Sequence, residues 1–344
     1  MDGISIIICC YNSVTRISPT LQHLASQRTC NQLSWEVLLI DNASTDNTAQ
    51  TAIQLWESFN SKIPLRIINE PRPGLSFARE TGLQDSHYNI AIFVDDDNWL
   101  KEDYIQIAYN TINANKGIGI LGGRVEAACE IEPPAWFEKS KAHYVIGEPY
   151  SQTGDVTEDR ATIYGAGMVI NKAAWKKLKA SGYKSQLSDR KGSQLSSGGD
   201  VELCFALKML GYRIYYHKDL VLKHFLPKAR LSWNYLEKLF PGFALAEIYL
   251  NCFQYFYSNS YSEDNYKHTI YKEFRKKVCD KLFNQKRNLV YLYLKGVPEG
   301  NRHFLYLKFY VVQLKFLMLH KKTFYAYLNY LNSFKKQISE STGR

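Results

Sequence analysis

Three aspartates stand side by side at the end of an apolar segment of the chain. Residues 90–94 read Ile-Ala-Ile-Phe-Val, and Asp95, Asp96 and Asp97 follow them directly. Helix capping explains one acidic residue at such a place, but three adjacent carboxylates repel one another unless a cation lies among them. Hard carboxylate oxygens are ligands that suit Mg²⁺ and Mn²⁺. The run therefore predicts a divalent-cation site.

Polar residues also follow two other apolar segments. Tyr11 and Asn12 end one of them, and Asp41 ends another. Asp46 lies a few residues further on and is explained by capping of the helix expected next. Because ligands of open α/β sheets bind beyond the carboxyl ends of the strands, we expect the residues after each apolar segment to share one site.

Short β-branched segments alternate with helical patterns through the first half of the chain. The expected strands cover residues 4–8, 37–40, 65–68 and 90–94. The expected helices lie near residues 14–28, 46–59, 75–85 and 102–115. Buried strands that alternate with helices indicate βαβ units, so the predicted fold is α/β with a mostly parallel sheet.

The second half of the chain has a different organisation. The pattern predicts an insertion over residues 124–160, a strand over 163–170, a helix over 172–180, a mobile loop over 185–199 and a helix from Asp200. From residue 232 onward the pattern is predominantly helical. We therefore predict one domain over residues 1–231 and a helical, basic and aromatic-rich region over residues 232–344.

Charge and cysteine usage exclude some classes of protein. Residues 267–344 carry 17 basic and 4 acidic residues, whereas the rest of the chain carries 26 and 29. This near-neutral body with a basic end is not the pattern of a nucleic-acid binder. Seven scattered cysteines without a CxxC pair favour reduced thiols and a cytoplasmic protein. We expect neither a signal peptide nor a membrane-spanning segment.

The basic end contains a repeating polar position. A register of seven residues places these polar side chains on one narrow stripe of an otherwise apolar helix: Lys308, Lys315, Lys322, Asn329 and Lys336. Such a helix either packs on the protein or lies at an anionic membrane surface. We favour packing, with peripheral membrane contact through residues 302–336 as the alternative.

Six segments together resemble the family 2 inverting glycosyltransferases, which carry the A-type nucleotide-sugar-binding fold. These segments, in the family's order, are residues 5–12, 39–48, 73–82, 93–99, 165–170 and 198–203. The resemblance extends over roughly residues 3–235. It implies a Rossmann-like α/β/α sandwich, a nucleotide diphosphate sugar as donor, and Mn²⁺ or Mg²⁺ as cofactor.

The resemblance assigns the nucleotide to residues at the ends of the first two strands and to an arginine. Asp41 would accept the N–H of a uracil ring, and Tyr11, beside Asn12, would stack against or border that ring. Arg79 lies on a helix that a glycine opens, and it would reach a phosphate or the ribose. Strand-end packing for Tyr11 and a solvated surface position for Arg79 are the alternatives.

The aspartate run has a divided role under the same resemblance. Asp95 would contact the ribose and share the metal site, Asp96 would contact the nucleotide, and Asp97 would bind the metal ion that bridges the two phosphates. His224 follows a strand-like segment and is a further candidate for the metal or a phosphate. A packed or capping histidine is the alternative.

Three residues remain for the acceptor side. Asp200 matches the general base that takes the proton of the acceptor hydroxyl, although an aspartate there also caps a helix. Glu202 lies two residues further on and either contacts the acceptor or serves the structure. Trp136, in the insertion, is either a platform for a sugar ring or a core anchor.

Together these features predict a cytoplasmic, metal-dependent, inverting glycosyltransferase. Its donor would be a nucleotide diphosphate sugar, most simply a UDP sugar, and its acceptor a glycan or a lipid-linked molecule in cell-surface polysaccharide synthesis. The alternatives are a sugar nucleotidyltransferase and a non-catalytic protein that binds nucleotide sugars or glycans. The segment after the first strand lacks the Gly-rich phosphate loop of the former and the GxGxxG of dehydrogenases. The sequence does not specify an oligomeric state.

Overall fold

In the computed structural model of the chain, the strands form one mixed sheet. The structure describes residues 1–187, 197–258, 266–285 and 299–342. The strand order is β3-β2-β1-β4-β8-β6-β9-β5, with β7 beside β9. The strands are β1 (Ile4–Cys10), β2 (Trp35–Asp41), β3 (Leu65–Asn69), β4 (Ile90–Asp95), β5 (Asn98–Leu100), β6 (Ile118–Cys129), β7 (Gly154–Asp155), β8 (Val169–Asn171) and β9 (Arg213–Leu226).

The four strands expected in the first half are confirmed, and they form the parallel part of the sheet. β1 lies between β2 and β4, and β3 continues the parallel order beyond β2. The register places Cys10 opposite Asp41 and Cys9 opposite Asp95. The polar residues after these strands therefore meet at one edge of the sheet, as expected from their position after the apolar segments.

Antiparallel strands extend the sheet beyond β4. β8 pairs antiparallel with both β4 and β6, and β9 pairs parallel with β6 and antiparallel with β5. The strand expected over residues 163–170 is wrong for most of its length, because β8 covers only Val169–Asn171. Gly167 has a φ of +71° and lies in a turn that interrupts the apolar segment.

Helices cover both faces of the sheet. The helices before the chain's end are α1 (Ile17–Ala25), α2 (Thr48–Ser58), α3 (Leu75–Asp85), α4 (Tyr104–Ala114), α5 (Lys172–Ala180) and α6 (Gly199–Met209). Buried side chains of α1, α2 and α4 pack in one apolar cluster, and those of α3, α5 and α6 pack in another. Along β1, Ile7 belongs to the second cluster and its neighbours Ile6 and Ile8 to the first, so the strand is buried on both faces. This is the expected α/β/α sandwich.

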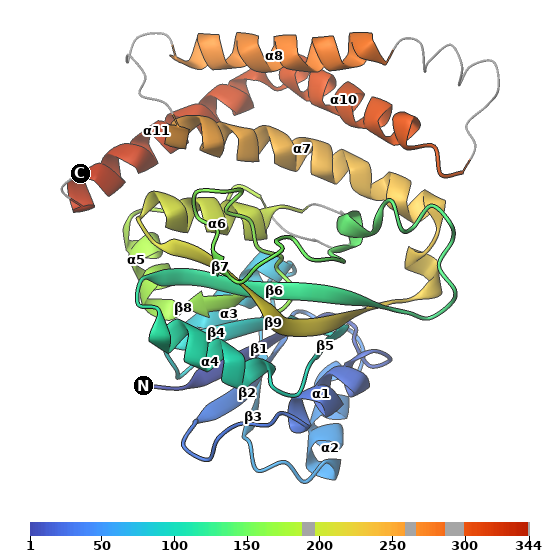
Figure 1. Ribbon diagram of the computed structural model, residues 1–344, viewed down its shortest axis with the longest axis vertical. Coiled ribbons are helices and arrows are strands. Elements are labelled where there is room, and N and C mark those ends of the chain that lie inside the picture. The colour runs from blue at the N-terminus through green and yellow to red at the C-terminus, as the bar shows by residue number, and fades with distance from the viewer. Residues whose placement is uncertain (188–196, 259–265, 286–298, 343–344) are drawn as a thin grey trace.

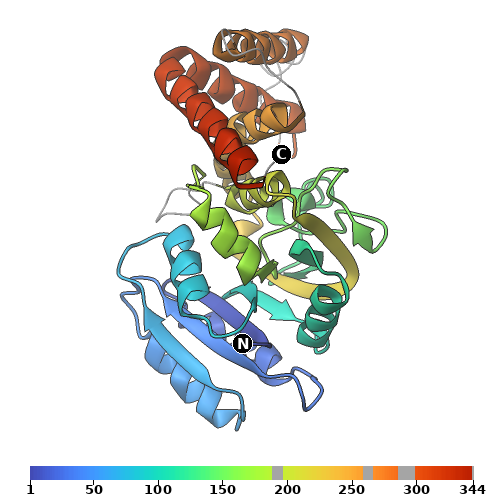
Figure 2. The ribbon, with the colours of Figure 1, turned by 90° about the vertical axis from the view of Figure 1, so that its left-hand side faces the viewer.

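The last part of the chain forms a helical layer on top of α6. It consists of α7 (Trp233–Ser258), α8 (Tyr266–Asn284), α10 (Arg302–Leu319) and α11 (Lys321–Thr342). Figures 1 and 2 show α7 against α6 and α8 farthest from the sheet. We call these four helices the outer helical layer. A domain boundary between residues 231 and 232 stays a prediction.

The structure corrects the polar stripe expected near the end of the chain. α10 ends at Leu319 and α11 begins at Lys321, so one straight helix does not carry the register of seven. Lys308 forms an ion pair with Glu237 of α7, with Nζ 2.9 Å from Oε2. Buried residues of α11, among them Phe324 and Phe334, join the same apolar cluster as α6.

Two further expectations concern the chain as a whole. Among the described residues, no helix is both long enough and apolar enough to cross a membrane. The mobile loop predicted over residues 185–199 lies largely outside the described residues, which end at 187 and resume at 197.

Candidate active site

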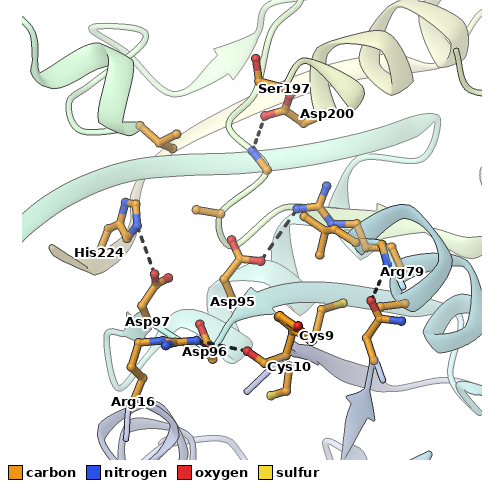
Figure 3. A pocket seen from close by; sticks show the side chains of 18 of the residues that line it. Cys9, Cys10, Arg16, Arg79, Asp95, Asp96, Asp97, Ser197, Asp200 and His224 are labelled. Atoms are coloured by element: carbon orange, nitrogen blue, oxygen red, sulfur yellow. Dashed lines mark hydrogen bonds and ion pairs between the residues drawn. The ribbon is translucent and has the colours of Figure 1, made fainter. Parts of the chain in front are cut away.

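A cavity of about 340 Å³ opens at the carboxyl ends of β1 and β4, beside the first turns of α3 and α6 (Figure 3). Its lining includes these predicted site residues: Tyr11, Arg79, Asp95, Asp96, Asp97, Asp200 and His224. It also includes residues that the sequence did not single out, notably Arg16, Asn42, Val145 and Arg230. The lining does not include Asn12, Asp41, Trp136 or Glu202.

One corner of the cavity brings Asp97, His224 and Arg230 together. Nη1 of Arg230 lies 2.8 Å from Oδ2 of Asp97, and Nε2 of His224 lies 3.6 Å from the same oxygen. Nδ1 of His224 lies 3.0 Å from the carbonyl oxygen of Tyr144. Because a carbonyl oxygen only accepts, Nδ1 carries a proton, and Nε2 is the ring nitrogen that faces the corner.

The ligand types in this corner fit a divalent cation whose coordination the substrate completes. Among the described residues, no group of three or more His, Cys, Asp or Glu side chains is arranged to hold a metal ion. Asp97 and His224 offer an oxygen and a nitrogen, and the Tyr144 carbonyl orients His224 as the outer contacts of metal-bound histidines do. Mg²⁺ in nucleotide enzymes is held by one or two carboxylates together with substrate phosphates and water.

Asp96 faces different partners from its neighbour. Its Oδ2 accepts hydrogen bonds from Oγ of Ser13 and from Nη2 of Arg16, the latter at 2.6 Å. Burial raises the pKa of the Asp96 carboxyl, Asp97 adds to the rise, and Arg16 and Ser13 oppose it. These contacts connect the end of β4 to the segment after β1. Asp96, which was predicted to contact the nucleotide, thus also stabilises the fold.

Arg79 and Asp95 lie in the middle of the cavity wall. Nη2 of Arg79 is 3.9 Å from Oδ1 of Asp95, and the guanidinium lies over the ring of Phe93 at 5.1 Å from its centroid. Arg79 is on α3, which begins after Gly74. The side chain is therefore a cation in the cavity, as its predicted phosphate contact requires.

The residues predicted to bind the uracil ring of the nucleotide differ in their exposure. Oδ1 of Asp41 is buried and has no hydrogen-bond partner among the described residues. Tyr11 is 51% exposed at the mouth of the cavity. Asn12 instead joins two loops: its Oδ1 accepts from the backbone N–H of Thr45 at 2.8 Å, and its own N–H donates to Oγ of Ser44 at 3.1 Å.

Asn42 is a cavity residue that sequence reasoning missed. Its Nδ2 donates to the carbonyl oxygens of Glu70 and Arg72 at 3.2 and 2.7 Å, and its Oδ1 accepts from the N–H of Gly74 at 2.8 Å. Hydrogen bonds from Arg72 and from the hydroxyl of Thr81 lower the pKa of Glu70 to about 2, against a smaller opposing effect of burial. This network holds residues 70–74 at the end of β2 and so positions the start of α3. Asn42 lies in the polar run after β2, where Asp41 was assigned to the nucleotide and Asp46 to helix capping.

Asp200 lies in the first turn of α6, across the cavity from Asp95 and Asp97 (Figure 3). Its Oδ2 accepts from the backbone N–H of Gly165 at 2.8 Å, and its Oδ1 accepts from that of Val201 at 2.9 Å. A Cβ atom at Gly165 would lie 3.2 Å from that Oδ2, so a glycine lets the two segments approach. The backbone therefore fixes the carboxylate in the cavity wall.

Glu202 and Trp136 both make contacts that join segments of the fold. Glu202 is fully buried, and its Oε2 accepts from Oγ of Ser185 at 2.7 Å and from the N–H of Leu187 at 3.0 Å. Trp136 donates from Nε1 to Glu299 at 2.8 Å and packs edge-on against Trp233. Neither residue reaches the cavity, because each is engaged in joining segments of the chain.

The chain is similar in sequence to known glycosyltransferases. The model of a protein family described as glycosyl transferase family 2 matches residues 5–178. The chain is similar to glycosyltransferase AglE of Haloferax volcanii, with 32% identity over 123 residues, 36% of this chain and 39% of AglE. It is also similar to the poly(ribitol-phosphate) β-N-acetylglucosaminyltransferase TarP of Staphylococcus aureus, with 26% identity over 140 residues, 40% of this chain and 42% of TarP. The chain thus spans less than half the length of these curated relatives.

A solved structure resembles the whole chain. It is the mannosyltransferase PcManGT from Pyrobaculum calidifontis in complex with GDP-Man and Mn²⁺. The superposition covers 98% of this chain and 87% of that one, with a TM-score of 0.55 and 15% sequence identity. At this identity the likeness shows the fold alone, and it confirms the α/β sandwich with its mixed sheet.

Proposed function

The chain belongs to glycosyl transferase family 2, with the A-type nucleotide-sugar-binding fold, and from this premise we propose that it moves a sugar from a nucleotide diphosphate to an acceptor hydroxyl. The observation that carries the proposal is the arrangement of one cavity. Asp97 and His224 lie on one wall and Asp200 lies on the opposite wall. Asp97 and Asp200 come from distant parts of the chain, and each wall has the chemistry that one half of a transfer reaction needs.

The proposed donor is a UDP sugar. The buried Oδ1 of Asp41 lies at the end of β2, one residue before the lining residue Asn42, and has no partner among the described residues; the N–H of a uracil ring that reaches it would supply this hydrogen bond. Tyr11, which follows the strand partner of Asp41 on β1, presents an exposed ring to the cavity. Arg79 supplies positive charge for the diphosphate.

We propose Asp97 and His224 as the holders of Mn²⁺ or Mg²⁺, with Asp95 next to them. When bound, the cation neutralises the charge that develops on the leaving diphosphate. Asp97 is buried and His224 is oriented by the Tyr144 carbonyl, so both side chains are placed before the donor arrives.

Asp200 is the proposed general base. Its carboxylate takes the proton from the acceptor hydroxyl while that oxygen attacks the anomeric carbon from the face opposite the diphosphate. Attack from that face inverts the configuration of the sugar. Backbone N–H groups of Gly165 and Val201 hold the carboxylate in its position for this step.

The proposal also covers the acceptor and the place in the cell where the enzyme acts. We propose a glycan or lipid-linked acceptor in cell-surface polysaccharide synthesis on the cytoplasmic side of the membrane. Met318 and Leu319, the last two residues of α10, are 64% and 66% exposed, and the exposed Lys315, Lys321 and Lys322 flank them. Apolar side chains with a basic rim favour contact with an anionic lipid surface.

A thermal-shift screen tests the donor and the metal together. We expect UDP or a UDP sugar with Mn²⁺ to raise the melting temperature, because a ligand of the folded state stabilises it by mass action. Stabilisation by GDP-mannose alone would replace uridine by guanosine in the proposal. No shift with any nucleotide would contradict it.

A second measurement separates the proposed transferase from its rivals. UDP release that depends on an added acceptor indicates transfer. Pyrophosphate formation from UTP and a sugar 1-phosphate would indicate a nucleotidyltransferase, and binding without any product would indicate a non-catalytic protein. We expect only the first.

A further inference from the structure

The guanidinium of Arg230 occupies the place between Asp97 and His224. Its Nη1 is 2.8 Å from Oδ2 of Asp97 and 3.3 Å from Nε2 of His224. The imidazole presents Nε2 there, because its Nδ1 faces the Tyr144 carbonyl oxygen. One nitrogen of the Arg230 guanidinium is therefore close to both an oxygen of Asp97 and a nitrogen of His224.

The ion pair between Arg230 and Asp97 is well shielded from water. The side chain of Asp97 is 5% exposed and that of Arg230 is 19% exposed. Each charge thus depends on the other, since a buried charge without its partner is strongly destabilised.

We propose that Arg230 and a divalent cation are alternative partners of Asp97, and that Arg230 transfers to the donor diphosphate when the cation takes its place. This inference rests on the metal-dependent part of the proposed function. Arg230 ends the short 3-10 helix Lys228–Arg230 between β9 and α7, so a change of side-chain conformation is enough to redirect its charge. A guanidinium binds phosphate oxygens as well as it binds a carboxylate.

The exchange makes binding of the cation and of the nucleotide cooperative. A cation that arrives alone has to displace Arg230 and leaves the guanidinium in the cavity without an anion. A diphosphate that arrives with the cation supplies that anion. The nucleotide therefore strengthens cation binding, and by linkage the cation strengthens nucleotide binding by the same factor.

The test measures Mn²⁺ binding by electron paramagnetic resonance on the full chain, first without nucleotide and then with UDP. Arg230→Gln removes the competing charge, and we expect it to bind Mn²⁺ alone about tenfold tighter or more than the parent does. UDP should then strengthen Mn²⁺ binding less in the variant than in the parent. Lys223→Gln is the matched control, because Lys223 is an exposed cation next to His224 on β9 and points to the other face of the strand. It should bind Mn²⁺ as the parent does.

Arg230→Lys keeps a weaker, point-like charge at the same position and should show an intermediate gain. Circular dichroism checks the fold of each variant, and Arg230→Lys replaces Arg230→Gln in the comparison should the latter not fold. Unchanged or weaker binding of Mn²⁺ alone in the folded variants, with normal Mn²⁺–UDP binding in the parent, would overturn the exchange and leave the proposed function standing. A parent that binds UDP equally well in excess chelator and never binds Mn²⁺ would overturn the proposed metal as well.

Discussion

The cavity and the outer helical layer both carry many charged side chains, but the structure holds those charges in different ways. In the cavity, carboxylates pair with arginines from distant segments, as Asp97 does with Arg230 and Asp96 with Arg16. In the outer helical layer, aromatic rings connect the helices; the Tyr249 and Tyr327 rings, for example, lie 4.6 Å apart. Lys315 near the end of α10 and Lys321 and Lys322 at the start of α11 are exposed.

This difference indicates which region tolerates a change of charge. A buried charge is fixed by its partner, so its removal changes the electrostatics that a charged ligand meets. An exposed lysine is surrounded by water, and its removal leaves the aromatic packing beneath it intact. Charge substitutions in the cavity should therefore alter binding and turnover strongly, and those at the exposed lysines of the outer helical layer should chiefly alter surface association.

The largest effect is expected at Asp200. Asp200→Asn keeps the shape of the side chain and one of its two acceptor oxygens for the backbone N–H groups of Gly165 and Val201, but it removes the proton acceptor, so turnover should fall by roughly two to four orders of magnitude. Donor affinity, measured by titration with UDP, should stay within a factor of about three because binding does not use the proton. Asp103→Asn, the same change before α4, is the control. Near-normal turnover of Asp200→Asn would contradict the assignment of Asp200 as the general base.

The second prediction separates two adjacent carboxylates. Asp97→Ala should abolish the Mn²⁺-dependent stabilisation by UDP, because the cation loses its buried carboxylate ligand. Asp96→Ala should instead lower the free energy of unfolding by roughly 1–3 kcal/mol, because Arg16 and Ser13 lose their partner. Thermal unfolding with and without Mn²⁺ and UDP measures both effects. Equal losses of metal response in the two variants would contradict the division of roles.

The polar residues at strand ends were predictable because their signal is local. Asp41, Asp95 and Asp97 follow apolar runs directly, and the register of β1 with its neighbours brings those ends together. The α/β sandwich is predictable for the same reason, since the alternation of short apolar segments and helical patterns extends over many residues. These parts of the prediction use only the order of residue types along the chain.

The rest depended on contacts between distant segments. Arg230 follows Asp97 by 133 positions in the sequence, and a lone arginine after a strand has no pattern that predicts its partner. Glu202 is buried because residues 185–187 fold over it, which its own helix does not indicate. The prediction that the polar residues from Lys308 onward form one stripe on a single helix was wrong. A register of seven in the sequence does not show that α10 ends at Leu319.

A smaller effect is expected at the rim of the cavity, in the network that positions α3. Glu70→Gln should lower the free energy of unfolding at neutral pH by about 1–2 kcal/mol, because Arg72 and Thr81 lose a charged acceptor and Arg72 is largely exposed. The folded-state pKa of about 2 lies below the ordinary value of 4.5, so the carboxylate stabilises the fold above pH 4.5. That contribution disappears as the pH falls through about 2, and the parent and the variant should converge. Glu57→Gln, on the exposed side of α2, should show no such convergence.

The smallest effect per residue is expected in the outer helical layer, and it tests whether the exposed lysines there have any function. Replacing Lys315, Lys321 and Lys322 by Gln should leave the turnover of a water-soluble acceptor unchanged and lower the melting temperature only slightly, because none of the three is buried and Lys321 alone of the three loses its contacts with rings, those of Tyr271 and Tyr325. Each lysine near an anionic surface contributes about 1 kcal/mol, so sedimentation with anionic liposomes should weaken at low salt and should differ little from the parent at high salt.

The control for this triple variant removes three exposed lysines from the sheet side of the molecule, Lys62, Lys116 and Lys218. It changes the net charge by the same amount, so a general loss of basic charge would weaken liposome binding equally in both. Weakening in the first variant alone would place the lipid contact at Met318 and Leu319, the exposed apolar pair that those lysines flank. Equal binding of liposomes by the parent and both variants would leave packing as the role of this region. The exposed lysines of the outer helical layer would then bind no ligand, in contrast to the charged residues of the cavity.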